Sequence, residues 1–176
     1  TRSRGNVLYE LDSRPALELY RLYLGEHAAG LPATGLLFPL SLRSGDGEAG
    51  RVRTMVGFDE GAGSLTFVGD IPQGHRARLM RANLDRLIDG AAGAATTTLS
   101  GLLGAPAELA LLISCVGRRM ILNQRVEEEV EAVRQVLGPL PAMAGFYSYG
   151  EIAPGVPNAR SELHNQTMTI TAFAEA

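Results

Sequence analysis

A series of short alternating segments separated by glycine-rich turns constrains the fold of this chain most strongly. Apolar residues alternate with other residues over 36–42 and 52–58, and a third short strand is expected over 65–69. The segments between them, 44–50 and 59–63, carry glycine and acidic residues, as hairpin turns do. The pattern predicts antiparallel hairpins, which a fold that alternates strictly between strand and helix would not contain.

Three segments with apolar residues at helical spacing predict helices. The first lies between a cap at Asp12 or Ser13 and a stop at Gly25, and the second runs from a cap at Asn83 to near Leu103. The third covers 126–137, with Glu127, Glu128, Glu129 and Glu131 expected to face outward. The alanine- and glycine-rich middle of the second segment also allows a linker, but its apolar spacing favours a packed helix.

The remaining segments predict further strands. These strands are expected over 6–10, 76–81, 109–116, 143–152 and 163–174. The run over 109–116 is almost entirely apolar, so we expect it to be covered on both faces. The arginines of 76–81 suit an edge strand. The predicted fold class is α+β, a mixed, largely antiparallel sheet of about seven or eight strands with about three helices packed against it.

Composition excludes several classes of protein. Apolar residues make up 45% and charged residues 20%, as in ordinary globular proteins. No apolar run approaches the ~18 residues that span a bilayer. The net charge of −3 argues against nucleic-acid binding. All 16 basic residues are arginine, which excludes lysine Schiff-base and P-loop chemistry, and the single cysteine excludes an internal disulfide.

The sequence shows no internal repeat and no domain boundary, so a single domain over 1–176 is expected. The chain begins with Thr1 rather than methionine and shows no secretory leader. We therefore expect a piece of a longer protein in a reduced, cytoplasmic setting.

Polar groups inside otherwise apolar strands mark the candidate functional segments. They are SCVGRR (114–119), GFYSYGEIAP (145–154), LHNQTMTI (163–170) and the turn GDIPQG (69–74). Strand alternation places Tyr147, Tyr149 and Glu151 on one face, as in the wall of a pocket. Arg118 follows a central strand, where its guanidinium can hold a carboxylate. The alternative is that Arg118 pairs with Glu151 or another internal acid.

The third candidate segment allows several interpretations. His164 shares a face with Met168 and Ile170, which suits either a hydrogen-bonded core histidine or a haem ligand. Cys115 and His164 with Asn165 follow the chain order of a cysteine protease. However, adjacent residues of a strand point to opposite faces, and a thiol in an apolar strand is not activated. The three histidines show no metal-ligand spacing. No catalytic motif is visible, and we expect a protein that is not an enzyme.

In these segments the chain resembles the FIST C-terminal domain (F-box and intracellular signal transduction proteins). The matching motifs are SCVGRR, GFYSYGEIAP and LHNQTMTITAFAE (163–175), in the family's order and spacing. The opening NVLYELDSRPALELY resembles the junction with an N-terminal FIST half, which places that junction at 1–14. The resemblance implies a bacterial sensory module that binds small ligands, amino acids among them. It also implies partnership with the N-terminal half and a signalling output domain, and, in a subset, sensing of nitric oxide by haem.

These observations lead to a ligand-sensing hypothesis. We expect Arg118 to bind the carboxylate and Glu151 the ammonium of an amino acid, while Tyr147, Tyr149 and Asn165 complete the site. No cofactor or metal is expected. One alternative is a haem-based nitric oxide sensor with His164 or His75 as the iron ligand. Another is a protein-interaction module, which would expose apolar surface and form a homodimer or bind a partner.

Overall fold

A computed structural model describes residues 1–45, 50–154 and 160–175. It divides into two compact units, Thr1–Ala82 and Asn83–Ala176, a division that the sequence pattern did not indicate. The predicted α+β class is confirmed, with most strands antiparallel. The strands form several small sheets rather than one sheet of seven or eight strands.

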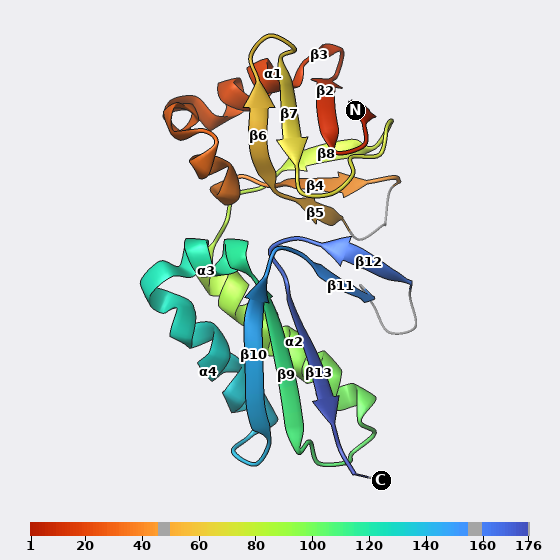
Figure 1. Cartoon of the computed structure of the whole chain (residues 1–176), viewed down its shortest axis with the longest axis vertical. Helices are drawn as coiled ribbons and strands as arrows, with labels where there is room; N and C mark the ends of the chain where they lie inside the picture. Colours follow the sequence, from red (N-terminus) through yellow and green to blue (C-terminus); the bar gives the residue numbers. More distant parts are fainter. Residues whose placement is uncertain (46–49, 155–159, 176) are drawn as a thin grey trace. The chain divides into compact units, whose positions relative to one another are not determined.

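In its described residues, the first unit contains two antiparallel sheets and one α-helix (Figure 1). One sheet has the order β1-β2-β7-β6, with β3 also paired to β2. Its strands are β1 (Arg2–Arg4), β2 (Val7–Leu11), β3 (Arg14–Pro15), β6 (Met55–Asp59) and β7 (Ser64–Phe67). The other sheet has the order β5-β4-β8 and contains β4 (Leu40–Arg43), β5 (Arg51–Arg53) and β8 (Arg76–Leu79). The helical segments are α1 (Ala16–Leu24), η1 (Gly25–Gly30) and η2 (Ala33–Leu37).

The core of the first unit forms where α1 packs on the strands. Leu17, Tyr20 and Leu24 of α1 are buried against residues such as Leu8 and Phe67. This is the apolar stripe that the helical spacing predicted. The Tyr20 hydroxyl donates a hydrogen bond of 2.7 Å to the carbonyl oxygen of Phe38, so its polar end is satisfied inside the core.

Local geometry corrects three predictions in this unit. The strand expected over 36–42 begins only at Leu40, because the preceding residues form η2 up to Leu37. Asp12 and Ser13 do not cap α1, because both have positive φ, 50° and 63°, and form the two-residue turn between β2 and β3. The run over 52–58 is not one strand, because it breaks at Thr54 into β5 and β6 of different sheets. β8 is an edge strand with exposed arginines, as predicted. The predicted turn over 44–50 lies largely outside the described residues.

The second unit carries the sheet β10-β9-β13, in which β10 runs parallel and β13 antiparallel to β9. A separate hairpin pairs β11 with β12. The strands are β9 (Leu109–Cys115), β10 (Ala142–Ser148), β11 (Glu151–Pro154), β12 (Ser161–His164) and β13 (Met168–Phe173). The helices are α2 (Leu84–Gly101), α3 (Val116–Leu122), η3 (Asn123–Arg125) and α4 (Val126–Leu137).

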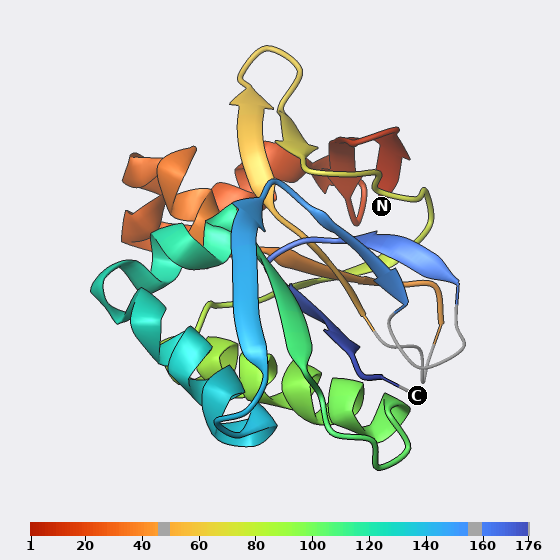
Figure 2. The same cartoon turned by 60° about the horizontal axis from the view of Figure 1, so that its bottom comes forward.

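Helices α2 and α4 cover one face of this sheet (Figures 1 and 2). Ala91 and Ala95 of α2 and Val133 of α4 are fully buried against the strands. Small alanine side chains let α2 approach closely, so the predicted helix is correct and the linker alternative is wrong. As predicted, the Asn83 side chain caps α2 by accepting a hydrogen bond of 3.0 Å from the backbone N–H of Arg86. Near the other end of α2, the Thr98 hydroxyl donates to the carbonyl oxygen of Ile170 in β13.

The opposite face of this sheet is open, which corrects the prediction that the 109–116 strand is covered on both faces. Leu111 of the central strand is 37% exposed, and Phe146 of β10 is 64% exposed. Two predicted strands are also shorter than expected. The run over 143–152 turns after Ser148, and the run over 163–174 breaks at Gln166, where φ is 56°. The loop expected at 154–157 lies mainly outside the described residues.

A close approach of β10 to β9 requires glycine at position 145. A Cβ atom there would lie 2.0 Å from the carbonyl oxygen of Leu112. We therefore expect Gly145→Ala to lower the free energy of unfolding by about 1–3 kcal/mol, because the two strands must separate to accept the methyl group. Urea titration followed by circular dichroism measures the change.

Gly93 of α2 provides the matched control. A Cβ atom at Gly93 would meet no atom within 4 Å. Gly93→Ala should raise stability by about 0.5–1 kcal/mol, since alanine favours the helix. Equal effects of the two substitutions would contradict the assigned packing of β10.

Candidate functional site

A buried ion pair between Arg118 and Glu129 lies at the centre of the second unit. Arg118 follows β9 on α3, and Glu129 lies in the first turn of α4. The Arg118 Nε and Nη2 atoms lie 2.9 and 2.8 Å from Glu129 Oε2. The two side chains are only 4% and 0% exposed. The sequence analysis expected Glu129 to face outward, and this expectation is wrong. Glu129 lies on the buried side of α4 and faces Arg118.

Arg118 is also bound to backbone carbonyls of two other segments. Its Nη2 donates to the carbonyl oxygen of Leu87 in α2 at 2.6 Å, and its Nη1 donates to that of Gln166 at 3.4 Å. These bonds direct the guanidinium toward the protein interior. The alternative in which Arg118 pairs with an internal acid is thus the arrangement present, with Glu129 rather than Glu151 as the acid.

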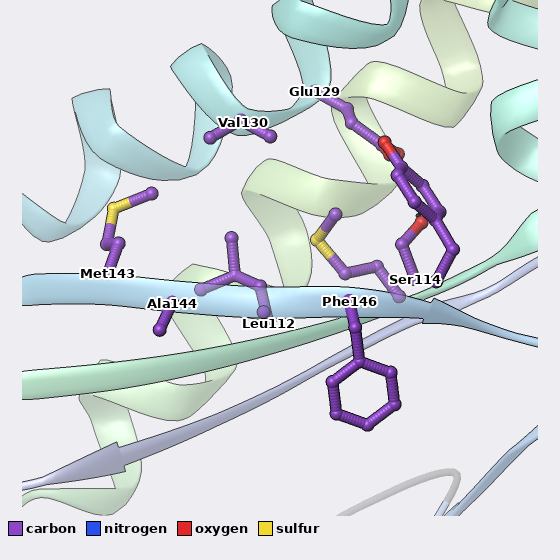
Figure 3. A pocket seen from close by; sticks show the side chains of 10 residues that line it. Leu112, Ser114, Glu129, Val130, Met143, Ala144 and Phe146 are labelled. Atoms are coloured by element: carbon purple, nitrogen blue, oxygen red, sulfur yellow. Dashed lines mark hydrogen bonds between the residues drawn. The ribbon is translucent and has the colours of Figure 1, made fainter.

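A pocket of about 250 Å³ opens beside this ion pair, between α4 and the strands β9 and β10. Apolar side chains form most of its wall, including Leu112, Val130 and Met143. In Figure 3 these side chains lie on the helix side of the sheet, whereas the Phe146 ring points to the other side. The complete lining is Leu112, Ser114, Glu129, Val130, Met143, Ala144, Gly145, Phe146, Tyr147 and Met168.

One end of the pocket is polar. The hydroxyls of Ser114 and Tyr147 donate to Glu129 Oε1 at 3.1 and 3.4 Å. Burial raises the pKa of the Tyr147 phenol, and the neighbouring Glu129 carboxylate raises it further. The phenol therefore stays protonated and remains a hydrogen-bond donor. This end of the pocket consists of two neutral hydroxyls backed by a fully buried carboxylate.

Glu151 belongs to a different cluster at the junction of β10 and β11. It is 2% exposed and accepts hydrogen bonds from the hydroxyls of Ser148 at 2.7 Å and Thr167 at 2.8 Å. The chain turn after Ser148 separates it from Tyr147, so the two residues do not share one strand face. Glu151 does not line the pocket that Tyr147 lines.

The other predicted ligand residues are also dispersed. Tyr149 lies in the turn between β10 and β11 and is 85% exposed. Asn165 is buried, and its side-chain amide donates to the carbonyl oxygen of His164. Of the predicted ligand residues, Arg118 and Tyr147 are therefore brought together. Both donate hydrogen bonds to Glu129. Ligand binding by the five residues stays a prediction.

The surroundings of His164 do not favour haem. Its Nε2 lies 2.9 Å from the carbonyl oxygen of Ala153 in the β11–β12 hairpin. His164 lines a second pocket of about 350 Å³, whose wall includes the threonines Thr97, Thr98, Thr167 and Thr169 rather than a continuous apolar crevice. His75 lies in the first unit. Haem binding through either histidine stays a prediction.

Cys115 is buried, as the sequence analysis expected. The residue lies at the end of β9, and burial raises the pKa of its thiol. Within residues 1–45, 50–154 and 160–175, no group of three or more histidine, cysteine or acidic residues is placed to hold a metal ion. None of the helices in the same ranges is long and apolar enough to cross a membrane.

Sequence reasoning missed Glu129 and gave no role to Ser114, although Ser114 begins the candidate segment SCVGRR. Glu129 follows Val126 by three positions and precedes Val133 by four, so helical spacing places it on the apolar stripe of α4. Ser114 alternates with the buried Ala110 and Leu112 of β9. In both cases, a polar residue at a position where the spacing predicts a buried apolar residue could have indicated the site.

Comparison with known families gives a match to the FIST C domain over residues 16–154. The chain belongs to the FIST C domain family. The match begins in α1 of the first unit and ends with β11 of the second, so it draws on both compact units. The FIST C family is one of sensory and signalling domains. No curated protein and no solved structure matches the chain.

The buried ion pair should contribute strongly to the stability of this FIST C domain. We expect Arg118→Met to lower the free energy of unfolding by about 3–5 kcal/mol, because it leaves the Glu129 carboxylate buried without its cation. The double variant Arg118→Met/Glu129→Leu should recover most of that loss, since it removes both charges. Urea titration of all three proteins measures the differences.

The exposed pair of Arg14 and Glu18 provides a control. Arg14→Met should change the free energy of unfolding by less than about 1 kcal/mol, because solvent screens this pair. If Arg118→Met costs no more than Arg14→Met, the ion pair does not have the structural role assigned to it.

Proposed function

We propose that this FIST C domain is part of a cytoplasmic small-ligand sensor, and that the pocket between β9, β10 and α4 holds the ligand. The observation that carries the proposal is the composition of the pocket. A mainly apolar wall ends at a few placed polar groups, Ser114, Glu129 and Tyr147. Small-ligand sites have this composition. The function is binding without catalysis, and a small amino acid is the ligand to test first.

The pocket is connected to the helices through its polar end. A ligand that bonds Glu129 Oε1 acts directly on α4, and Glu129 is joined through Arg118 to α3 and to the Leu87 carbonyl of α2. Ligand binding would thereby favour one arrangement of these helices over another. An N-terminal FIST half and an output domain are the partners that we propose to read this change.

Filling the pocket tests the proposal. We expect calorimetry of this chain against the common amino acids to detect at least one ligand. Val130→Phe should weaken its affinity by about tenfold or more, equivalent to 1.4 kcal/mol, because the ring occupies the pocket. Val130 lines the pocket from the exposed side of α4, so the helix itself accepts the larger side chain.

Gln135→Phe adds the same ring to the same helix at an exposed position outside the pocket wall. This control should leave the affinity unchanged. Absence of binding by all the amino acids, or equal weakening by both substitutions, would contradict the proposed pocket.

The open face of the β10-β9-β13 sheet favours a second function, protein interaction. In the strand register, Phe146 lies beside Ile113, and Phe173 lies beside Leu109. Phe146 and Phe173 are 64% and 49% exposed. The residues of this face are Leu109, Leu111, Ile113, Ala142, Ala144, Phe146, Ser148, Thr169, Thr171 and Phe173. Because none of them is charged, a second copy packs on this face without opposing like charges, and we propose a homodimer.

Sedimentation velocity tests the homodimer. The chain should dimerise with increasing concentration, and Phe146→Lys should shift it to monomer, because each copy then brings a charge to the buried contact. Val56→Lys, a substitution at an exposed apolar position of β6, is the control and should leave the dimer intact. A monomer at every concentration, or association that ignores Phe146→Lys, would exclude this contact.

A further inference from the structure

Arg119 is a cation beside the pocket that the ligand-sensing hypothesis did not use. It follows Arg118 in α3, but its side chain is exposed rather than buried. Its guanidinium carbon lies 5.3 Å from the centre of the Tyr147 ring, a cation–π contact with a pocket residue. In the described part of the chain, no carboxylate lies within ion-pair distance of Arg119, in contrast to Arg118 with its partner Glu129.

The charges around Tyr147 leave an excess of positive charge. Glu129 contributes one negative charge, and Arg118 and Arg119 contribute one positive charge each. Burial and the Glu129 carboxylate raise the pKa of the Tyr147 phenol, and Arg119 and Arg118 partly offset this rise, which is consistent with both guanidinium groups lying near the hydroxyl. Since Glu129 is matched by Arg118 in the buried pair, the uncompensated charge is that of Arg119. An anionic group on a ligand would balance it.

The cation–π contact with Tyr147 favours this role for Arg119. The contact uses no N–H group, so the guanidinium donors stay able to match the two oxygens of a carboxylate. The adjoining wall of Leu112, Val130, Met143 and Met168 accepts an apolar chain. A cation next to an apolar pocket selects a molecule with a carboxylate at one end and a short hydrocarbon chain at the other.

We propose that Arg119 is the carboxylate-binding residue of this pocket and that the ligand is a small apolar carboxylic acid, either an amino acid or its deaminated acid. The proposal rests on the proposed sensor function and makes its ligand class specific. It assigns to Arg119 the role that the sequence analysis gave to Arg118. Glu129 and Tyr147 then bound the polar end, and an α-ammonium group, where present, reaches Glu129 Oε1 by displacing one of its two hydroxyl donors.

Matched probes separate the two ends of the ligand. Leucine, 4-methylpentanoate and 3-methylbutylamine share one hydrocarbon chain and carry, respectively, both charged groups, the carboxylate alone and the amine alone. Phenylalanine, 3-phenylpropanoate and 2-phenylethylamine form a second set. Calorimetry of this chain should detect binding of the carboxylates of at least one set, and the corresponding amine should bind at least about tenfold more weakly.

Variants of the chain then identify the cation. Arg119→Met should weaken carboxylate binding by about 10- to 100-fold, as expected for loss of a charge-assisted hydrogen bond, and Arg119→Lys should have a smaller effect. Arg86→Met removes another exposed arginine, from α2, and should leave the affinity unchanged. All three variants should keep the thermal midpoint of the parent chain, because both arginines are exposed.

The outcomes distinguish this inference from the proposed function. If a probe binds and Val130→Phe weakens it, but Arg119→Met does not, the pocket stands and the role of Arg119 is wrong. An amine that binds as tightly as its matching acid also overturns the carboxylate assignment. If no member of either set binds, the proposed ligand class is wrong. The sensor function is then decided by the calorimetry of this chain against the other common amino acids.

Discussion

The second unit depends on a pair of opposite charges that is almost completely removed from water. Arg118 and Glu129 stabilise each other because their ion pair forms together with the hydrogen bond from Arg118 to the Leu87 carbonyl oxygen. These bonds compensate for the removal of both charges from water. The guanidinium connects α3 with α4 and α2, and the carboxylate accepts hydroxyls from β9 and β10. Helices and sheet are therefore positioned by one polar network, which gives the unit a specific arrangement that apolar packing alone would leave less well defined.

This network also determines what the neighbouring pocket is able to bind. Because Arg118 is engaged within the protein, it is poorly placed to receive a ligand, and the carboxylate-binding role is proposed for the adjacent, exposed Arg119. Glu129 is fully buried, and its Oε1 atom accepts the hydroxyls of Ser114 and Tyr147 at the polar end of the pocket. Two consecutive arginines thus have different environments, one inside the core and one at the surface, because a helix turns successive side chains to different sides.

Local sequence patterns predicted much of the secondary structure but little of the site. The apolar stripe and the stop at Gly138 defined α4, and Asn83 defined the start of α2. In contrast, alternation continues through Tyr149 even though the chain turns after Ser148, so pattern alone placed Tyr149 and Glu151 on the wrong strand face. Motifs identified the family, but of the five predicted ligand residues only Tyr147 lines the pocket. Which acid meets Arg118 is a long-range packing outcome that no local pattern contains.

The hydroxyl that connects α2 to β13 has a consequence for how this sheet is able to grow. Thr98 already occupies a backbone acceptor, the Ile170 carbonyl, on the outer side of β13. The other border of the sheet is β10, whose outer side pairs with no strand among the described residues of the unit. The two edges of the sheet therefore differ in the backbone groups that they offer to an incoming strand. Strand exchange or fibril-like stacking of this unit would begin at β10.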